Sequence, residues 1–136
     1  MAGKEEAPLG IAVIDSLTGN FLDINPRFAD IVGRSKEQII SSDWMHITHP
    51  DDIQEYMYGI SLLNARKISV AKITKRYIRL DNSIVWVKLS SVPIKTESSA
   101  QHHLQMIEDI TETRLAEQMN QRLGNILEQS INEISD

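Results

Sequence analysis

The stretch that decides the fold is AKITKRYIRLDNSIVWVKLSSVPI, residues 71–94. Two runs rich in Ile, Val, Tyr and Trp flank the triplet Asp81-Asn82-Ser83, and Asn and Asp tolerate the positive φ that tight turns need. In the second run aliphatic residues alternate with Trp86, Lys88 and Ser90, which is the period of a strand with one buried face. The stretch therefore predicts a β-hairpin with one face on a core and the other available to a partner.

Length, composition and charge limit the class of protein to which the chain can belong. The 136 residues suit one domain plus an appendage, and the 41% hydrophobic and 24% charged fractions are typical of globular proteins. A net charge of −5 argues against a nucleic-acid partner, which would require a basic surface. The chain has no cysteine and no apolar run near the roughly 20 residues that cross a bilayer. We therefore expect a cytoplasmic location and no membrane contact within this fragment.

The segment before the hairpin predicts a second hairpin and two short helices. Residues 1–8 are expected to be disordered or a linker, whereas apolar runs at 9–14 and 21–24 flank a turn cluster. Asn25-Pro26 opens a helix that ends at Gly33, because Asn caps helices, Pro suits their first position and Gly suits the residue after them. Ser35 with Gln38 has the spacing of a capping box.

A longer helix and a last strand complete the body. The tetrapeptide 49–52, His-Pro-Asp-Asp, opens the helix, since its carboxylates favour the positive end of the helix dipole. Five residues are predicted to share one face of this helix: Ile53, Tyr56, Met57, Ile60 and Leu63. A last strand is predicted over 103–110, after a polar loop at 96–102. His102 and His103 are expected to lie in the polar loop before this strand and to be solvated.

Residues 112–136 predict a long amphipathic helix. Its apolar residues recur at steps of three and four, with one extra step of four that interrupts a strict heptad. They are Ala116, Met119, Leu123, Leu127, Ile131 and Ile134. A helix of about 25 residues spans roughly 37 Å, more than this body needs. We expect it to pair with a second copy or to lead into another domain; the alternative is that it folds back over the open sheet face.

Five motifs in register resemble a PAS domain, a sensory family with a trailing signalling helix. They are GIAVID at 10–15, NPRF at 25–28, HPDD at 49–52, RLDNSIVWV at 79–87 and DIT at 109–111. The resemblance implies an α+β fold, in which a five-stranded antiparallel sheet carries helices on one face and a long C-terminal amphipathic helix follows. It divides the chain into a linker (1–8), a PAS domain (9–111) and a signalling or linker helix (112–136). Residues 122–134 weakly resemble the helix that introduces a further PAS repeat, so tandem repeats in a bacterial signalling protein are expected.

The resemblance implies a sensor, a dimerisation module or both, upstream of a histidine kinase or a cyclic-dinucleotide enzyme. A ligand pocket would lie between the inner sheet face and the helices; the alternative is that the same residues only fill a core. The candidate pocket residues are Phe28, Ile31, Trp44, Met57, Ile73, Val85, Val87 and Leu89. Asp109 and Thr111 are the candidate signal junction, and Trp86, Met119, Leu123 and Leu127 are the candidate dimer interface.

Cofactors and catalysis receive little support from the sequence. Without cysteine the chain lacks the adduct residue of photoactive flavin-binding relatives, and the predicted long helix, 50–64, lacks the histidine of haem-binding ones. A non-covalently bound flavin or a small metabolite stays compatible with the sequence. His46 and His49 lie near two carboxylates, but those carboxylates already have a structural role at a helix start, so no metal site is predicted. No phosphate loop or nucleophile motif is present, and we predict a regulatory domain and not an enzyme.

Overall fold

The computed structural model describes residues 9–95 and 101–135, and it has the fold that the sequence predicts. The predicted linker and most of the polar loop lie outside the described residues. In chain order the elements are β1 (Gly10–Asp15), β2 (Phe21–Ile24), α1 (Pro26–Val32), α2 (Lys36–Ile40), α3 (Trp44–Ile47), α4 (Pro50–Asn64), β3 (Ala71–Ile78), β4 (Ile84–Ile94), β5 (His102–Asp109) and α5 (Thr111–Ser135).

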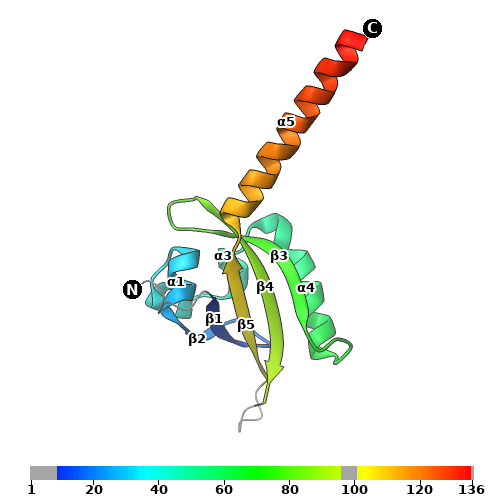
Figure 1. Ribbon diagram of the computed structural model, residues 1–136. Coiled ribbons are helices and arrows are strands. Elements are labelled where there is room, and N and C mark those ends of the chain that lie inside the picture. Colours follow the sequence, from blue (N-terminus) through cyan, green and yellow to red (C-terminus); the bar gives the residue numbers. More distant parts are fainter. Residues whose placement is uncertain (1–8, 96–100, 136) are drawn as a thin grey trace, which may run out of the picture.

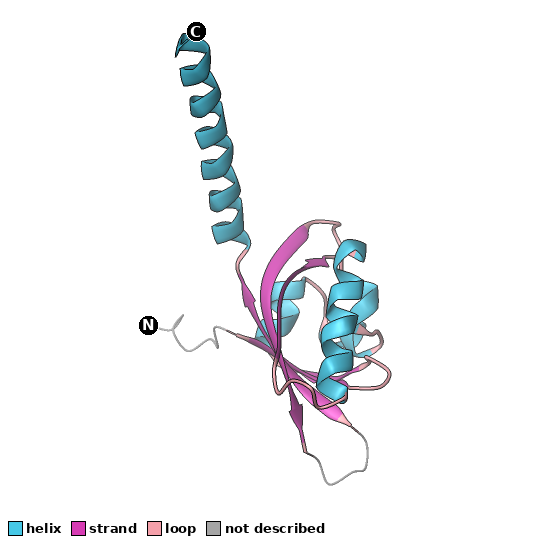
Figure 2. Ribbon diagram, turned by 90° about the vertical axis from the view of Figure 1, so that its right-hand side faces the viewer, coloured by secondary structure: helices cyan, strands magenta, loops and turns pink. Residues whose placement is uncertain are grey.

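The five strands form one antiparallel sheet in the order β2-β1-β5-β4-β3, so β2 and β3 are its edges. The central hairpin is confirmed: β3 and β4 pair from Ala71↔Ser91 to Ile78↔Ile84, and Asn82 in their turn has a φ of 67°. The helix α4 lies along one side of the sheet, and α5 leaves the body and projects away from it (Figures 1 and 2).

Local capping interactions fix the short helices as predicted. The side chain of Asn25 accepts a hydrogen bond from the Phe28 amide at 2.9 Å, and α1 ends at Gly33 with a φ of 66°. Ser35 and Gln38 form the reciprocal capping box. These caps place Phe28 and Ile31 against the sheet, where the aliphatic residues of β4 complete the core.

Two sequence predictions are wrong. Met57 is 47% exposed and not on the buried face of α4, which Tyr56, Ile60 and Leu63 occupy. The reason is geometric: residues 56, 60 and 63 lie within about 60° of one another around the helix axis, whereas residue 57 lies about 60–120° from each of them. His103 is not solvated, because it lies within β5 and is 1% exposed.

The exit helix does not fold back over the sheet. The large apolar side chains that the sequence places along one face of α5, its apolar seam, are more than half exposed, as Met119, Leu123 and Leu127 illustrate at 52%, 51% and 64%. The contacts of α5 with the body are made mainly with β4. An exposed apolar seam along a helix of this length leaves a face that a partner helix could cover.

Candidate functional site

Most of the predicted pocket residues meet in the core between the helices and the inner sheet face. Phe28, Ile31, Trp44, Val85, Val87 and Leu89 are all buried there, and Ile73 is partly buried against the same cluster. Met57 does not join them. The core therefore brings together seven of the eight candidates, although burial by itself does not distinguish a pocket from a filled core.

A lysine lies within this core. Lys75 of β3 is fully buried, and its Nζ donates a hydrogen bond to Thr48 Oγ1 at 2.9 Å. The rings of Trp44, Tyr56 and Tyr77 surround the amine, with Nζ 5.0, 4.2 and 4.6 Å from their centroids. Burial lowers the pKa of Lys75 well below its ordinary value of 10.5, and the charge of the Asp52 carboxylate raises it only in part.

Two influences act on the charge of the amine in opposite directions. The aromatic faces attract an ammonium ion, but burial without a carboxylate in contact opposes the charge more strongly. Asp52 does not contact the amine, because its carboxylate oxygens are held by Arg76 at 2.8 and 3.0 Å. Lys75 is thus a buried amine within a ring of aromatic side chains.

Next to the amine, hydrogen bonds join four buried polar side chains in a continuous series. The Tyr56 hydroxyl is 2.8 Å from Ser91 Oγ and accepts from Gln105 Nε2 at 2.7 Å, and the Tyr77 hydroxyl donates to Gln105 Oε1 at 3.1 Å. Burial raises the pKa of Tyr56 to about 12, and the bonds from Ser91 and Gln105 offset this only in part. The network joins α4 to strands β3, β4 and β5.

His103 is a further buried polar side chain on the inner face of β5. Its Nδ1 is 2.9 Å from Ser16 Oγ, while its Nε2 is buried and has no partner among the residues that the structure describes. Burial lowers the pKa of His103 to about 4, and the Asp15 carboxylate raises it only in part. The inner face of β5 therefore carries a neutral imidazole beside the glutamine of the network.

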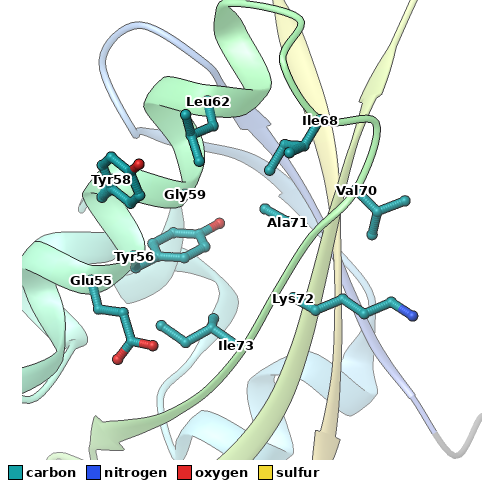
Figure 3. Close-up of a pocket in the computed structure, with 10 residues that line it drawn as sticks. All are labelled: Glu55, Tyr56, Tyr58, Gly59, Leu62, Ile68, Val70, Ala71, Lys72 and Ile73. Atoms are coloured by element: carbon teal, nitrogen blue, oxygen red, sulfur yellow. The ribbon is translucent and has the colours of Figure 1, made fainter.

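A groove of about 280 Å³ opens between α4 and β3 and reaches the network at Tyr56. Figure 3 shows Tyr56 extending from α4 toward Ala71, with Leu62 and Ile68 at one end of the groove and Glu55 and Ile73 at the other. The groove is lined by Glu55, Tyr56, Tyr58, Gly59, Leu62, Ile68, Val70, Ala71, Lys72 and Ile73. Only Ile73 of the sequence candidates lines it.

The predicted junction residues lie where β5 passes into α5. Thr111 Oγ1 accepts a hydrogen bond from the Trp86 amide at 2.9 Å, and the Ile110 amide donates to the Trp86 carbonyl at 2.9 Å. Asp109 Oδ1 accepts from the Thr111 amide at 2.9 Å, and its other oxygen is 4.0 Å from the Arg79 guanidinium. The first turn of α5 is therefore tied to β4.

Trp86 is partly covered by its own exit helix. The guanidinium of Arg114, in the first turns of α5, lies 4.3 Å from the centre of the Trp86 ring, and that of Arg76 lies 4.9 Å from it. Arg76 also binds both oxygens of Asp52 in α4. A continuous chain of contacts thus runs from the start of α4 across β3 and β4 to α5.

Two further kinds of site were searched for. Over residues 9–95 and 101–135, no three His, Asp or Glu side chains come together in a way that could hold a metal ion. Within the same ranges no helix is both long and apolar enough to span a membrane.

The sequence prediction missed the polar half of the site: Lys75, Tyr77, Ser91, His103 and Gln105. One signal was available, because strand alternation places Lys75 on the face of Ile73 and Tyr77. The partners of Gln105 and His103 were not predictable in this way, since Tyr56 and Ser16 lie 49 and 87 positions away in the chain.

Comparisons with known proteins agree with this geometry. A family model described as PAS fold matches residues 21–107. The chain is 27% identical over 120 residues to the probable diguanylate cyclase DgcE of Escherichia coli (strain K12), and the match covers 88% of this chain but only 11% of that protein's length.

Solved structures show the same fold. A PAS domain from Colwellia psychrerythraea is 27% identical, with a TM-score of 0.68, and the match covers 78% of this chain and 89% of that one. A sensory box histidine kinase/response regulator structure from Burkholderia thailandensis gives a TM-score of 0.70 at 15% identity, with 90% of this chain and 92% of that chain covered. At that identity the second likeness concerns the fold alone.

Proposed function

We propose, from the premise that this chain belongs to the PAS fold family, that it is a cytoplasmic sensory module at residues 9–111 whose exit helix transmits a signal to an effector. Binding of a ligand or a partner at the core would shift β5, and the junction would carry that shift into α5. The effector would lie outside this chain. A cyclic-dinucleotide enzyme is favoured over a histidine kinase, because the curated relative is a probable diguanylate cyclase.

One observation supports this proposal most directly: the start of α5 is hydrogen-bonded to a strand that carries core residues. Trp86 holds Thr111 and Ile110, and its neighbours Val85 and Val87 are fully buried in the core. A ligand that displaced these neighbours would move the backbone to which the helix is attached. The interrupted seam of α5 offers two packings of similar energy, which suits a switch.

The exposed apolar seam of α5 leads to the prediction that the chain forms a dimer. We expect the wild-type chain to be dimeric in native mass spectrometry and the variant Leu123→Asp with Leu127→Asp to be monomeric, because two carboxylates would replace the apolar contact. Gln121→Asp with Asn125→Asp is the matched control, since it adds the same charge at the same spacing on the opposite side of α5. If both variants stay dimeric, the seam is not the interface.

The hydrogen bonds of Asp109 and Thr111 lead to the prediction that removing them loosens the start of α5 from β4. In the variant Asp109→Ala with Thr111→Ala, we expect amide hydrogen exchange at the start of α5 and at Trp86 to rise by roughly fivefold or more, since each lost hydrogen bond contributes about 1 kcal/mol. Amides in β1 should keep their protection.

Thr111→Ser is the control for the junction, because it retains the hydroxyl that accepts from Trp86. In a protein that carries an effector after α5, the double alanine variant should also lose signal-dependent output. An output that still responds normally would contradict the proposed route through the junction.

The competing function is a ligandless module that only holds two chains together. The complete burial of Phe28, Val87 and Leu89 and the buried hydrogen bonds of Tyr56 favour it, because a filled core leaves no room for a ligand. Native mass spectrometry of the purified chain separates the two functions. A dimer with additional mass supports sensing of a metabolite or a non-covalent flavin, and a dimer without it favours assembly.

A further inference from the structure

The groove between α4 and β3 lies beside an open sheet edge. β3 is the last strand of the sheet, and its backbone groups alternate between β4 and the free edge. At Arg76 the groups on the free edge are occupied: its amide donates to Asp52 Oδ2 and its carbonyl accepts from the His49 amide. This fixes which residues of β3 point their backbone outward.

By the same alternation, Lys72 and Thr74 direct their amides and carbonyls toward the free edge. Among residues 9–95 and 101–135 no hydrogen-bond partner for these edge groups is found. Both side chains are exposed, on the outer face of the sheet, whereas Ile73 between them turns toward the groove. An edge strand with free backbone groups is a template for another strand.

The groove offers an apolar surface to a side chain that an added strand would direct toward the inner face of the sheet. It is apolar over Gly59, Leu62, Ile68, Val70 and Ile73, with the Glu55 carboxylate at one end (Figure 3). Its volume of about 280 Å³ lies just below the roughly 300–1,000 Å³ of small-molecule pockets. The size and the adjacent free backbone favour a side chain of a bound strand over a free metabolite.

We propose that this groove binds an extended peptide segment of a partner protein, which adds to β3 as a sixth strand. The peptide backbone pairs with Lys72 and Thr74, and the residue between the two pairs lies opposite Ile73 with its side chain in the groove. That residue is aliphatic, and Glu55 favours a basic residue beside it. This surface is separate from the exit helix.

Two substitutions test the two parts of the proposed site, which are the apolar groove and the free backbone edge of β3. Gly59→Leu fills the groove, because a Cβ there meets only the Ala71 Cβ, at an ordinary 3.7 Å, and leucine favours the helix over glycine. Thr74→Pro removes an edge amide without breaking the β4 ladder, which edge strands tolerate. Thr74→Val is the matched control, since it keeps the amide and the branched shape.

The probe is a phage-displayed library of random peptides, selected on the wild-type chain and counter-selected on the Gly59→Leu variant. The enriched peptide is then synthesised and its affinity measured by fluorescence anisotropy. We expect an alternating segment with one invariant aliphatic residue, and an affinity at least about tenfold lower for Gly59→Leu and Thr74→Pro but nearly unchanged for Thr74→Val. The peptide should also slow hydrogen exchange of the Lys72 and Thr74 amides.

Three results would overturn the proposal. One is no enrichment above the uncoated support, and another is a peptide whose affinity is indifferent to both Gly59→Leu and Thr74→Pro. The third is self-association: if Thr74→Pro but not Thr74→Val lowers the oligomeric state of the wild-type chain, a second copy occupies the edge. Circular dichroism of each variant verifies that a lost affinity does not come from lost folding.

Discussion

Replacing Lys75 with methionine is expected to raise the free energy of unfolding by about 1–4 kcal/mol at pH 7. The amine is fully buried and its pKa is lowered well below 10.5, so folding disfavours the charged form that the unfolded chain prefers at neutral pH. Methionine has a similar length and no charge to desolvate. Thr48 keeps its own hydrogen bond to the Trp44 carbonyl.

The pH dependence of the free energy of unfolding tests whether the buried Lys75 amine causes this difference in stability. Between the lowered pKa of the folded chain and the ordinary 10.5, the unfolded chain binds a proton at Lys75 that the folded chain does not, so wild-type stability should rise with pH by up to about 1.4 kcal/mol per unit. The gain is complete above the ordinary pKa of 10.5. Lys75→Met should lack this rise. Urea denaturation at several pH values measures both effects.

Lys88→Met is the control, because Lys88 is exposed on β4 and its loss should change stability by about 0.5 kcal/mol or less. Destabilisation by Lys75→Met would mean that the amine is charged and held by the three aromatic rings. A stabilised Lys75→Met with impaired signalling would instead show that the lysine is retained for function at a cost in stability.

The fold was predictable because its signals are local. The turn at Asn82, the cap at Asn25 and the stop at Gly33 each act within a few residues, and the structure has all three. The alternation of β4 likewise identified Val85 and Leu89 as buried. These signals were consistent with one another along the chain, which is why five motifs in register sufficed to predict the family.

The polar half of the core was not predictable, because long-range partners decide it. On β5 the inward residues are His103, Gln105 and Ile107, while the apolar Leu104 and Met106 face outward. Hydrophobicity alone assigns this strand to the wrong face. The hydrogen bonds of Gln105 to α4 and β3, and that of His103 Nδ1 to Ser16 after β1, are tertiary contacts that strand periodicity does not reveal.

His103 should make the chain sensitive to mild acid. Its pKa is about 4 in the folded chain and 6.5 ordinarily, chiefly because burial opposes the charged imidazolium. Between these two values the unfolded chain binds a proton that the folded chain does not, so stability falls as pH decreases. Integrated over that range, the expected loss is about 3 kcal/mol, and above about pH 7 His103 contributes almost no pH dependence.

The variant His103→Gln isolates this effect, because glutamine does not titrate. We expect the difference in unfolding free energy between wild type and His103→Gln to change by about 3 kcal/mol from pH 6.5 to pH 4, and to be constant above pH 7. Equal acid sensitivity in His103→Gln and wild type would mean that the buried imidazole accepts a proton without unfolding. In that case its unpartnered Nε2 must find an acceptor in the folded core.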